Sequence, residues 1–238
     1  EKWISLKLAQ YKGIAANLSF ITLEKAIYQS LKKSLQNRNC ELIKQETIQS
    51  LLMDLLREKL GSTDPVWNPV RSYLNPETDI NSEAIEHRLF QLSDRLFYLF
   101  KEYEYSRNED LIKAWDEGRN AFDNQLLGTE SWQRRLWNDL FGEKGKLTFF
   151  NRSLNDLNDE QLHTELFTLP QLYRICRENQ KNYVSDQVDS VSVPVAGTLH
   201  IFGVSYLSQF HQNALTEYLS HFRDIHVYTL NPCMEFWE

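Results

Sequence analysis

The sequence predicts an α/β protein in which a partial parallel sheet carries a large, all-helical insertion. Two short apolar segments flank an amphipathic one within residues 198–233, which is the pattern of a strand, a crossover helix and a second strand. A third strand-like segment lies at residues 14–20, and nearly everything in between has the apolar spacing of helices. We therefore assign residues 1–38 and 196–238 to the α/β core and residues 39–195 to the insertion.

The N-terminal segments alternate between helix and strand patterns. Apolar residues from Trp3 to Tyr11 recur at helical spacing, and Gly13 suits the position just after the helix. Residues 14–20 (IAANLSF) then indicate a buried strand, and Thr22 suits the N-cap of a helix that runs to about Gln36. Because the sequence begins without methionine inside a helical pattern, we expect it to be a fragment.

The insertion contains a series of amphipathic helices. The pattern predicts helices over residues 46–60, 64–74, 82–105 and 129–140, and two more between 151 and 180. Residues 182–195 are polar and lack a helical period, so we place the boundary with the core there. The helix over 82–105 has a long apolar seam that Phe90, Phe97 and Phe100 widen, and the seam consists of Ile85, Leu89, Leu92, Leu96, Leu99 and Tyr103.

The C-terminal residues 198–230 have the pattern of a strand, a helix and a second strand. Leu199, Ile201, Phe202 and Val204 form a run too short for a helix and too continuous for a half-exposed strand, which predicts an interior parallel strand. An amphipathic helix follows, with apolar residues at three- and four-residue steps from Leu207 to Phe222. The second strand spans residues 225–230, before Pro232.

Composition excludes several classes of protein. The chain has 238 residues, 42% hydrophobic and 25% charged, and no apolar run near 18 residues, which is typical of a soluble protein without a membrane span. Three cysteines lie far apart without a C-x-x-C motif, so we expect a reducing, cytoplasmic location. The net charge of −7 disfavours a surface that grips duplex DNA mainly through its phosphates, although a local basic groove is compatible with it.

The residues needed for nucleotide hydrolysis or for a metal site are missing from the sequence. There is no G-x-x-x-x-G-K-[ST] phosphate loop, and residues 203–205 (GVS) follow the predicted strand where a magnesium-binding carboxylate would be needed. His221, His226 and Cys233 match no zinc spacing. We therefore expect no catalytic residue, no metal ligand and no cofactor in this chain.

Several short segments resemble one known family. They are residues 13–17 (GIAAN), 89–93 (LFQLS), 103–107 (YEYSR), Trp115, Trp132, 136–137 (LW), 201–205 (IFGVS) and 231–233 (NPC). In this order they are similar to the N-terminal helicase-like region of the RecC family, the gamma subunits of the RecBCD exonuclease V complex. The resemblance implies an inactive superfamily 1 helicase-like fold in a subunit that joins RecB-like and RecD-like motor subunits. It also implies duplex splitting, guidance of the 3′-ended single strand and reading of the Chi sequence, in a complex that uses ATP and magnesium.

The resemblance also implies a set of DNA-reading positions. They fall on Lys2, Thr22, Tyr28, Tyr98, Leu99, Lys101, Arg107 and Arg152. Leu99, Arg107 and Arg152 keep the residue type of the best-known members, and the others depart from it, so the sequence recognised is expected to differ or reading to be lost. Aromatic faces and cations are the groups that bind single strands, and the three-residue spacing of Tyr98 and Lys101 places both on one exposed helix face.

Alternative roles stay open on sequence grounds. Tyr28 and Tyr98 suit the rim of a packed interface, and Arg107 and Arg152 suit solvated or ion-paired positions. At the level of function, the alternatives are a fragment of an active ATP-dependent helicase or helicase-nuclease, and a module that contacts only proteins.

Overall fold

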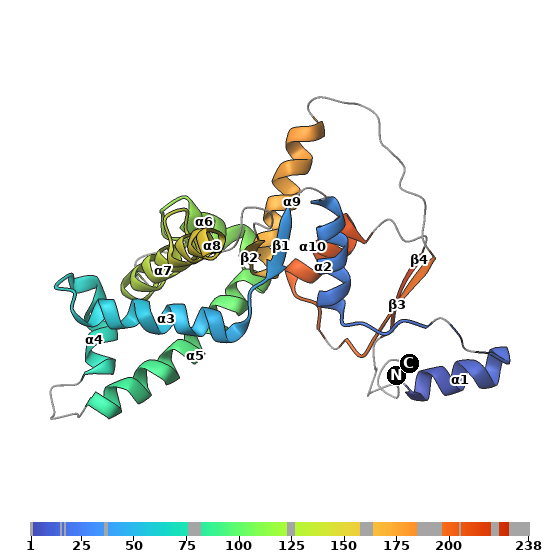
Figure 1. Ribbon diagram of the computed structural model, residues 1–238, viewed down its shortest axis with the longest axis horizontal. Helices are drawn as coiled ribbons and strands as arrows, with labels where there is room; N and C mark the ends of the chain where they lie inside the picture. The colour runs from blue at the N-terminus through green and yellow to red at the C-terminus, as the bar shows by residue number, and fades with distance from the viewer. Residues whose placement is uncertain are drawn as a thin grey trace.

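The computed structural model describes residues 2–14, 16, 18–35, 38–75, 82–122, 127–157, 164–184, 197–204, 206–219 and 224–228. These residues are mostly helical and include two small parallel sheets of two strands each. Figure 1 shows a helical part at one end, a mixed helix and sheet part in the middle, and a second small sheet at the other end. None of the described helices is both long and apolar enough to cross a membrane.

The helical end is built from the predicted insertion helices. Its elements are α3 (Gln45–Leu60), the short η1 (Pro65–Trp67), α4 (Asn68–Leu74), α5 (Ser82–Ser106), η2 (Asn108–Ile112), α6 (Lys113–Asp116), α7 (Leu127–Phe141) and α8 (Lys146–Leu157). Their apolar stripes bury Leu52, Leu56, Phe100, Trp115 and Trp137 in one cluster, the helical core. The predicted helices are confirmed here.

A second cluster, the junction core, lies in the middle of the molecule. It packs α2 (Leu23–Ser34), α9 (Leu169–Val184) and α10 (Gln209–Tyr218) together, with Leu31, Tyr173 and Phe210 fully enclosed. Strands β1 (Asn39–Leu42) and β2 (Thr164–Phe167) pair in parallel beside them, with Cys40 opposite Glu165. The predicted N-cap of α2 is confirmed, because the Thr22 hydroxyl accepts the Lys25 N–H at 3.2 Å.

The strand, helix and strand unit near the C-terminus is also confirmed. Strands β3 (Thr198–Phe202) and β4 (Asp224–Tyr228) are parallel, with His200 opposite His226, and α10 connects them. The expectation of a fully interior strand is wrong, because Ile201 is the buried residue of β3 while Phe202 is 49% exposed. One face of this sheet packs on the junction core, and its other face is open.

Three further expectations are corrected. The described residues of the segment 14–20 form no strand, and Ile14 is 78% exposed. Among the residues that the structure describes, no strand pairs with this segment to supply the backbone hydrogen bonds that a strand requires. The stretch 39–195 is not all helical, since it contains β1 and β2. Phe90, expected to widen the seam of α5, points to solvent.

Two expectations about the chain's organisation have mixed outcomes. Residues 182–184 continue α9 instead of starting the polar linker, whose remaining residues lie outside the described ranges. The division into domains at 38/39 and 195/196 stays a prediction. Helix α1 (Lys2–Lys12) forms as expected and ends at Gly13, whose φ of +83° is the left-handed conformation that glycine adopts easily, but the helix buries none of its residues.

Candidate nucleic-acid interface

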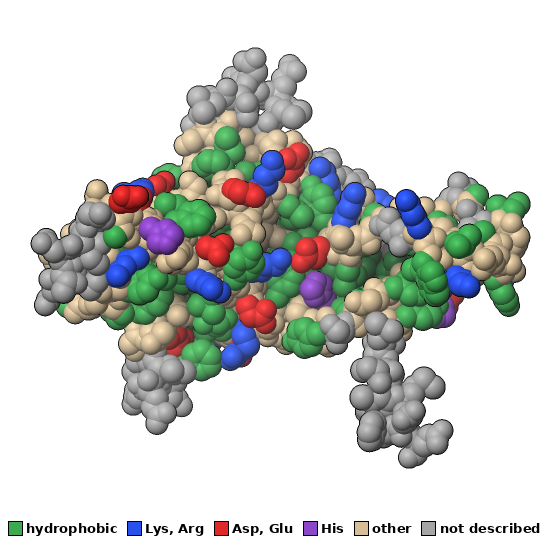
Figure 2. All heavy atoms as spheres, turned by 90° about the horizontal axis from the view of Figure 1, so that it is seen from below, with side chains coloured by type: hydrophobic (Ala, Val, Ile, Leu, Met, Phe, Trp, Pro, Cys, Tyr) green, Lys and Arg blue, Asp and Glu red, His purple; other side chains and the backbone are tan. Residues whose placement is uncertain are grey.

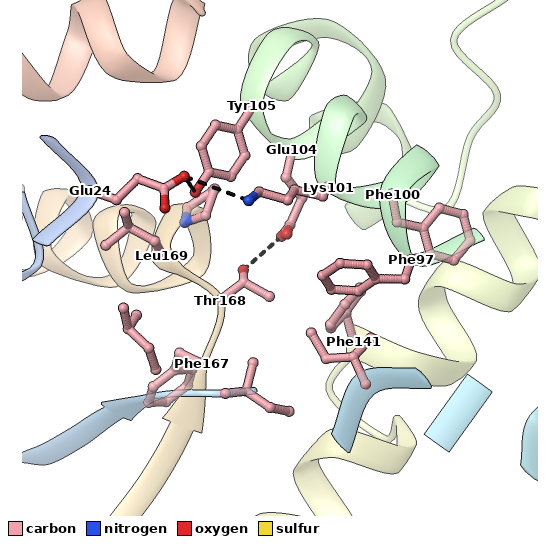
Figure 3. Close-up of a pocket in the computed structure, with 14 residues that line it drawn as sticks. Glu24, Phe97, Phe100, Lys101, Glu104, Tyr105, Phe141, Phe167, Thr168 and Leu169 are labelled. Atoms are coloured by element: carbon pink, nitrogen blue, oxygen red, sulfur yellow. Dashed lines mark hydrogen bonds and ion pairs between the residues drawn. The ribbon is translucent and has the colours of Figure 1, made fainter. Parts of the chain in front are cut away.

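A pocket of about 150 Å³ lies where the helical core meets the junction core. Figure 3 shows its side chains converging from α5, from α2 and from the turn that joins β2 to α9. The walls are apolar and come mainly from Phe97, Phe100, Phe141, Phe167 and Leu169. Three charged side chains, Glu24, Lys101 and Glu104, interrupt this lining and give the pocket its polarity.

Glu104 is the buried acid of this pocket. It follows Leu96 and Phe100 at steps of four along α5, so the helix carries it to the inner face, where it is only 2% exposed. Its carboxylate accepts the Thr168 hydroxyl at 3.1 Å and lies 3.5 Å from the Arg174 guanidinium. Burial raises the pKa of Glu104 to about 7, and Arg174 and the Thr168 hydrogen bond oppose that rise.

A second acidic residue, Glu24, also lines the pocket and contacts two side chains of α5. Its carboxylate accepts the Tyr105 hydroxyl at 2.9 Å and lies 3.6 Å from the Lys101 ammonium (Figure 3). Lys101 also lies over the Tyr105 ring, with its ammonium 5.3 Å from the ring centroid. The charge of Lys101 is therefore already matched by the Glu24 carboxylate.

Tyr98 and Lys101 share the exposed face of α5, as their spacing predicts. The Tyr98 side chain is 53% exposed, packs edge-on against Phe97 and accepts a 3.3 Å hydrogen bond from the Gln45 amide. A base could stack on the free part of this ring. Leu99, between them, is partly buried against the helical core, so packing already accounts for it.

The two candidate residues of α2 have structural partners. Thr22 caps the helix, and the partly buried Tyr28 donates its hydroxyl to the Cys40 carbonyl at 3.0 Å, which ties α2 to β1. Lys32 lies over the Tyr28 ring, with its ammonium 5.7 Å from the centroid. The alternative of a packing rim therefore fits Tyr28.

The remaining three candidates are spread over the molecule. Arg107, just past α5, pairs with Asp110 at 2.8 Å and lies over the Phe122 ring. Arg152 is exposed on α8 beside Phe149, and Lys2 is exposed on α1. Figure 1 shows α1 and α8 far apart along the molecule, so Lys2 and Arg152 lie in separate places. Tyr98, Leu99 and Lys101 share α5, whereas Thr22 and Tyr28 belong to α2 and its N-cap.

The described residues were also compared with the pattern of a metal site. Among them, no three His, Cys, Asp or Glu side chains are arranged to hold a metal ion. Strand β3 is followed by Gly203 and Val204 where a magnesium-binding carboxylate would be needed, and Ser205, His221 and Cys233 lie outside the described ranges. No hydrolytic step can be derived from these side chains.

Sequence reasoning missed Glu24, Glu104 and Thr168. A signal existed for Glu104, because a carboxylate at a four-residue step from Leu96 and Phe100 breaks an apolar stripe. No local pattern marks Glu24 or Thr168, since each acquires its role from a partner that is distant in the sequence.

Comparison with known proteins places the chain in a family. The family model "RecC, N-terminal domain" matches residues 1–238. The RecBCD enzyme subunit RecC of Haemophilus influenzae is 25% identical over 254 residues, covering 99% of this chain and 20% of the relative. The protein of the same name from Escherichia coli K12 is 25% identical over 240 residues, covering 99% of this chain and 18% of the relative. The chain spans about a fifth of the length of these relatives.

The chain belongs to the RecC family and corresponds to that family's N-terminal domain.

Proposed function

We propose that this chain is the N-terminal part of a non-catalytic subunit of a RecBCD-type exonuclease V. The subunit would hold RecB-like and RecD-like motor subunits together and handle DNA during double-strand-break repair and recombination, in the cytoplasm. The observation that carries the proposal is the family match over the whole chain, to relatives named as RecBCD enzyme subunits. The ATP and magnesium chemistry would belong to the partner subunits.

An inactive helicase-like framework is the architectural part of this proposal. The parallel β3–α10–β4 unit supports it, because parallel strands joined by a helix are the building unit of nucleotide-binding sheets. The Gly203–Val204 pair after β3 supports the loss of hydrolysis. In this view the β3–β4 sheet has a scaffolding role, and the residues that contact single-stranded DNA lie on the helical part of the chain.

The DNA-handling part of the proposal centres on the α2–α5 junction. There the exposed Tyr98 ring offers a stacking surface, Lys101 further along α5 lines the pocket, and Thr22 caps α2, whose Glu24 lines the pocket as well. Stacking of one base on an aromatic ring contributes about 1–3 kcal/mol. We propose that the 3′-ended strand passes here during duplex splitting and Chi reading. Lys101 and Arg107 are both paired with carboxylates, so the isolated fragment should bind DNA weakly.

The test uses the three-subunit complex reconstituted with the natural full-length chain. Tyr98→Ala should weaken the response of the translocating complex to its recognition sequence by roughly 5- to 150-fold, which corresponds to the loss of one stacked base. Tyr73→Ala is the matched control, because Tyr73 is a similarly exposed tyrosine on α4, remote from the pocket residues. Sequence response on a DNA library and ATP hydrolysis are measured together, and ATP hydrolysis should not change.

A second pair of variants tests whether Arg107 takes part in the sequence response. Arg107→Ala should reduce the sequence response, whereas Arg119→Ala should not, although both arginines are exposed and paired with a nearby carboxylate. Equal behaviour of Tyr98→Ala and Tyr73→Ala, and of the two arginine variants, would favour a module that contacts only proteins. ATP turnover by the subunit after removal of both motor subunits would favour an active helicase instead.

A further inference from the structure

Arg107 lies where the long helix α5 changes its winding. After Ser106 the chain continues into η2, a single turn of π-helix. The backbone N–H groups of Leu111 and Ile112 both bond to the Arg107 carbonyl, at 3.1 and 3.2 Å. Single turns of this kind are frequent at functional sites. At this turn the Asp110 side chain, three positions later, faces that of Arg107.

The Arg107 guanidinium is held by two neighbours. Its Nε and Nη2 atoms lie 2.9 and 2.8 Å from Asp110 Oδ2, which fixes one edge of the planar group. The guanidinium also lies over the Phe122 ring, with its carbon 5.1 Å from the ring centroid. A guanidinium that is bonded along one edge and packed against a ring keeps one orientation. Phe122 therefore helps to determine where Arg107 points.

Glu130 anchors the segment that carries Phe122. This segment lies outside the helices and strands, whereas Glu130 belongs to α7 and is only 3% exposed. The Glu130 carboxylate accepts the backbone N–H groups of Ala121 at 2.5 Å and of Phe122 at 3.0 Å. It also accepts the indole N–H of the buried Trp115 at 2.9 Å. These three donors compensate the burial of the charge, and together they fix Phe122 relative to the helical core.

Both carboxylate oxygens of Glu130 are needed for this anchor. One oxygen, Oε1, accepts from Trp115 and Ala121, and the other, Oε2, accepts from Phe122. Glutamine has one acceptor oxygen, so it cannot hold all three donors in the same way. Glu130 lies too deep to contact a ligand, whereas the Arg107 side chain is 42% exposed. Any effect of Glu130 on a ligand must therefore pass through another residue.

The distribution of charge makes the orientation of single cations important. Figure 2 shows basic and acidic side chains interspersed on the face that it displays, and the chain as a whole has a net charge of −7. A broad basic surface attracts the phosphates of any nucleic acid, regardless of sequence. A single arginine with a fixed guanidinium can instead distinguish among the paired acceptors of a strand by their direction.

We propose that Glu130 is a positioning residue for Arg107, acting through Phe122 on the orientation of the guanidinium. The inference rests on the proposed function, in which Arg107 takes part in the response to DNA sequence. It adds to that function the two residues that determine where this arginine points.

Arginine modification measures the orientation of Arg107 without DNA. The three-subunit complex with the natural full-length chain is treated with phenylglyoxal, and mass spectrometry gives the modification rate of Arg107 relative to Arg57. Arg57 is the internal reference because it is similarly exposed and pairs with Glu86 on another helix. Phe122→Leu and Glu130→Gln should each raise this ratio about two- to fivefold, which corresponds to the loss of one exposed cation–π contact. Phe122→Tyr keeps the ring and should leave the ratio unchanged. Unchanged ratios in Phe122→Leu and Glu130→Gln would overturn the proposal.

The sequence response of the same complex tests whether Glu130 acts through Arg107. Glu130→Gln should reduce the response by about two- to fivefold with ATP hydrolysis unchanged. The double variant Arg107→Ala with Glu130→Gln should respond no less than Arg107→Ala alone. Asn138→Ala is the matched control for lost stability, because Asn138 also lies on α7 and donates to the Trp115 carbonyl at 3.1 Å. This control should leave the response unchanged.

The outcomes separate this inference from the function on which it rests. Reductions that multiply in the double variant, or an equal reduction by Asn138→Ala, would show that Glu130 acts only on stability and would contradict the proposal. If Arg107→Ala reduces the response but Glu130→Gln and Phe122→Leu do not, the positioning role is wrong and the proposed DNA role stands. If Arg107→Ala itself has no effect, both are wrong.

Discussion

Glu104 is a carboxylate buried in the interior, an environment that disfavours its charged form. A fully buried carboxylate is costly unless hydrogen bonds and an opposite charge compensate it. Thr168 and Arg174 provide this compensation, and Arg174 also lies 3.6 Å from Asp116, so its positive charge is shared between two acids. The pKa of Glu104 therefore stays raised, at about 7.

This raised pKa gives a pH dependence of stability with a defined sign. The folded state holds the Glu104 proton up to about pH 7, whereas the unfolded chain releases it near the reference pKa of 4.5. Glu104 therefore contributes stability that is fully present below about pH 4.5 and is lost as the pH rises through about 7, in total about 3 kcal/mol.

Glu104→Gln tests this sign, because glutamine keeps an acceptor for Thr168 and cannot ionise. The free energy of unfolding of the native chain, relative to this variant, should fall between pH 5 and pH 8, as measured by urea denaturation. Glu102→Gln, an exposed position on the same helix, is the control and should follow the native curve. Parallel curves for the native chain and Glu104→Gln would contradict the assignment.

Individual site residues could be predicted to different degrees. The exposed positions of Tyr98 and Lys101 follow from their three-residue spacing on a helix whose seam is evident in the sequence. The partners of Tyr28 and Lys101 could not be predicted, because Cys40 and Glu24 approach them only after α2, β1 and α5 have packed together. The same holds for Tyr105, whose hydrogen-bond partner Glu24 lies 81 positions earlier in the sequence.

At the scale of elements, helices were predicted more accurately than strands. Each helix carries its own stripe and termini, such as the Thr22 N-cap of α2 and the end of α3 at Gly61. A strand requires a partner, and β1 finds its partner β2 about 125 positions later, as the hydrogen bond between Asn39 and Thr164 shows. The segment 14–20 has a strand pattern but no such partner in the described structure.

The α5 helix provides an element-scale prediction with an internal control. Phe100 is enclosed in the helical core, whereas Phe90 on the same helix is mostly exposed. Phe100→Ala should lower the free energy of unfolding by about 3–5 kcal/mol, because it leaves a cavity in a packed core. Phe90→Ala should change it by less than about 0.5 kcal/mol. Denaturant titration followed by circular dichroism measures both, and similar losses would show that the inner face of α5 is assigned wrongly.

At the scale of the whole molecule, α5 connects the two cores. From Ile85 to Tyr103 its apolar residues pack in the helical core, and at its end Tyr105 packs against the junction core, with ring centroids 4.9 Å from Phe210. The Tyr105 hydroxyl is bonded to Glu24 of α2, and burial raises the pKa of this hydroxyl above its usual range. One aromatic residue thus links α5 to both α2 and α10.

Tyr105→Ala should uncouple the two cores. We expect its thermal unfolding, followed by calorimetry, to separate into two transitions, whereas the native chain should unfold in one. Tyr105→Phe keeps the ring contact with Phe210 and loses only the hydrogen bond to Glu24, so it should retain a single transition at a lower temperature. A single sharp transition in Tyr105→Ala would show that other contacts couple the cores.

The sequence by itself determined the helices, the parallel β3–α10–β4 unit and the family resemblance, because these depend on local spacing and short motifs. Only the tertiary structure decided the pairing of β1 with β2, the pocket with Glu24, Lys101 and Glu104, and the exposure of Phe202 and Tyr228. Those features arise from contacts between residues distant in the chain. Such contacts depend on how the helical faces pack together, which no local pattern specifies.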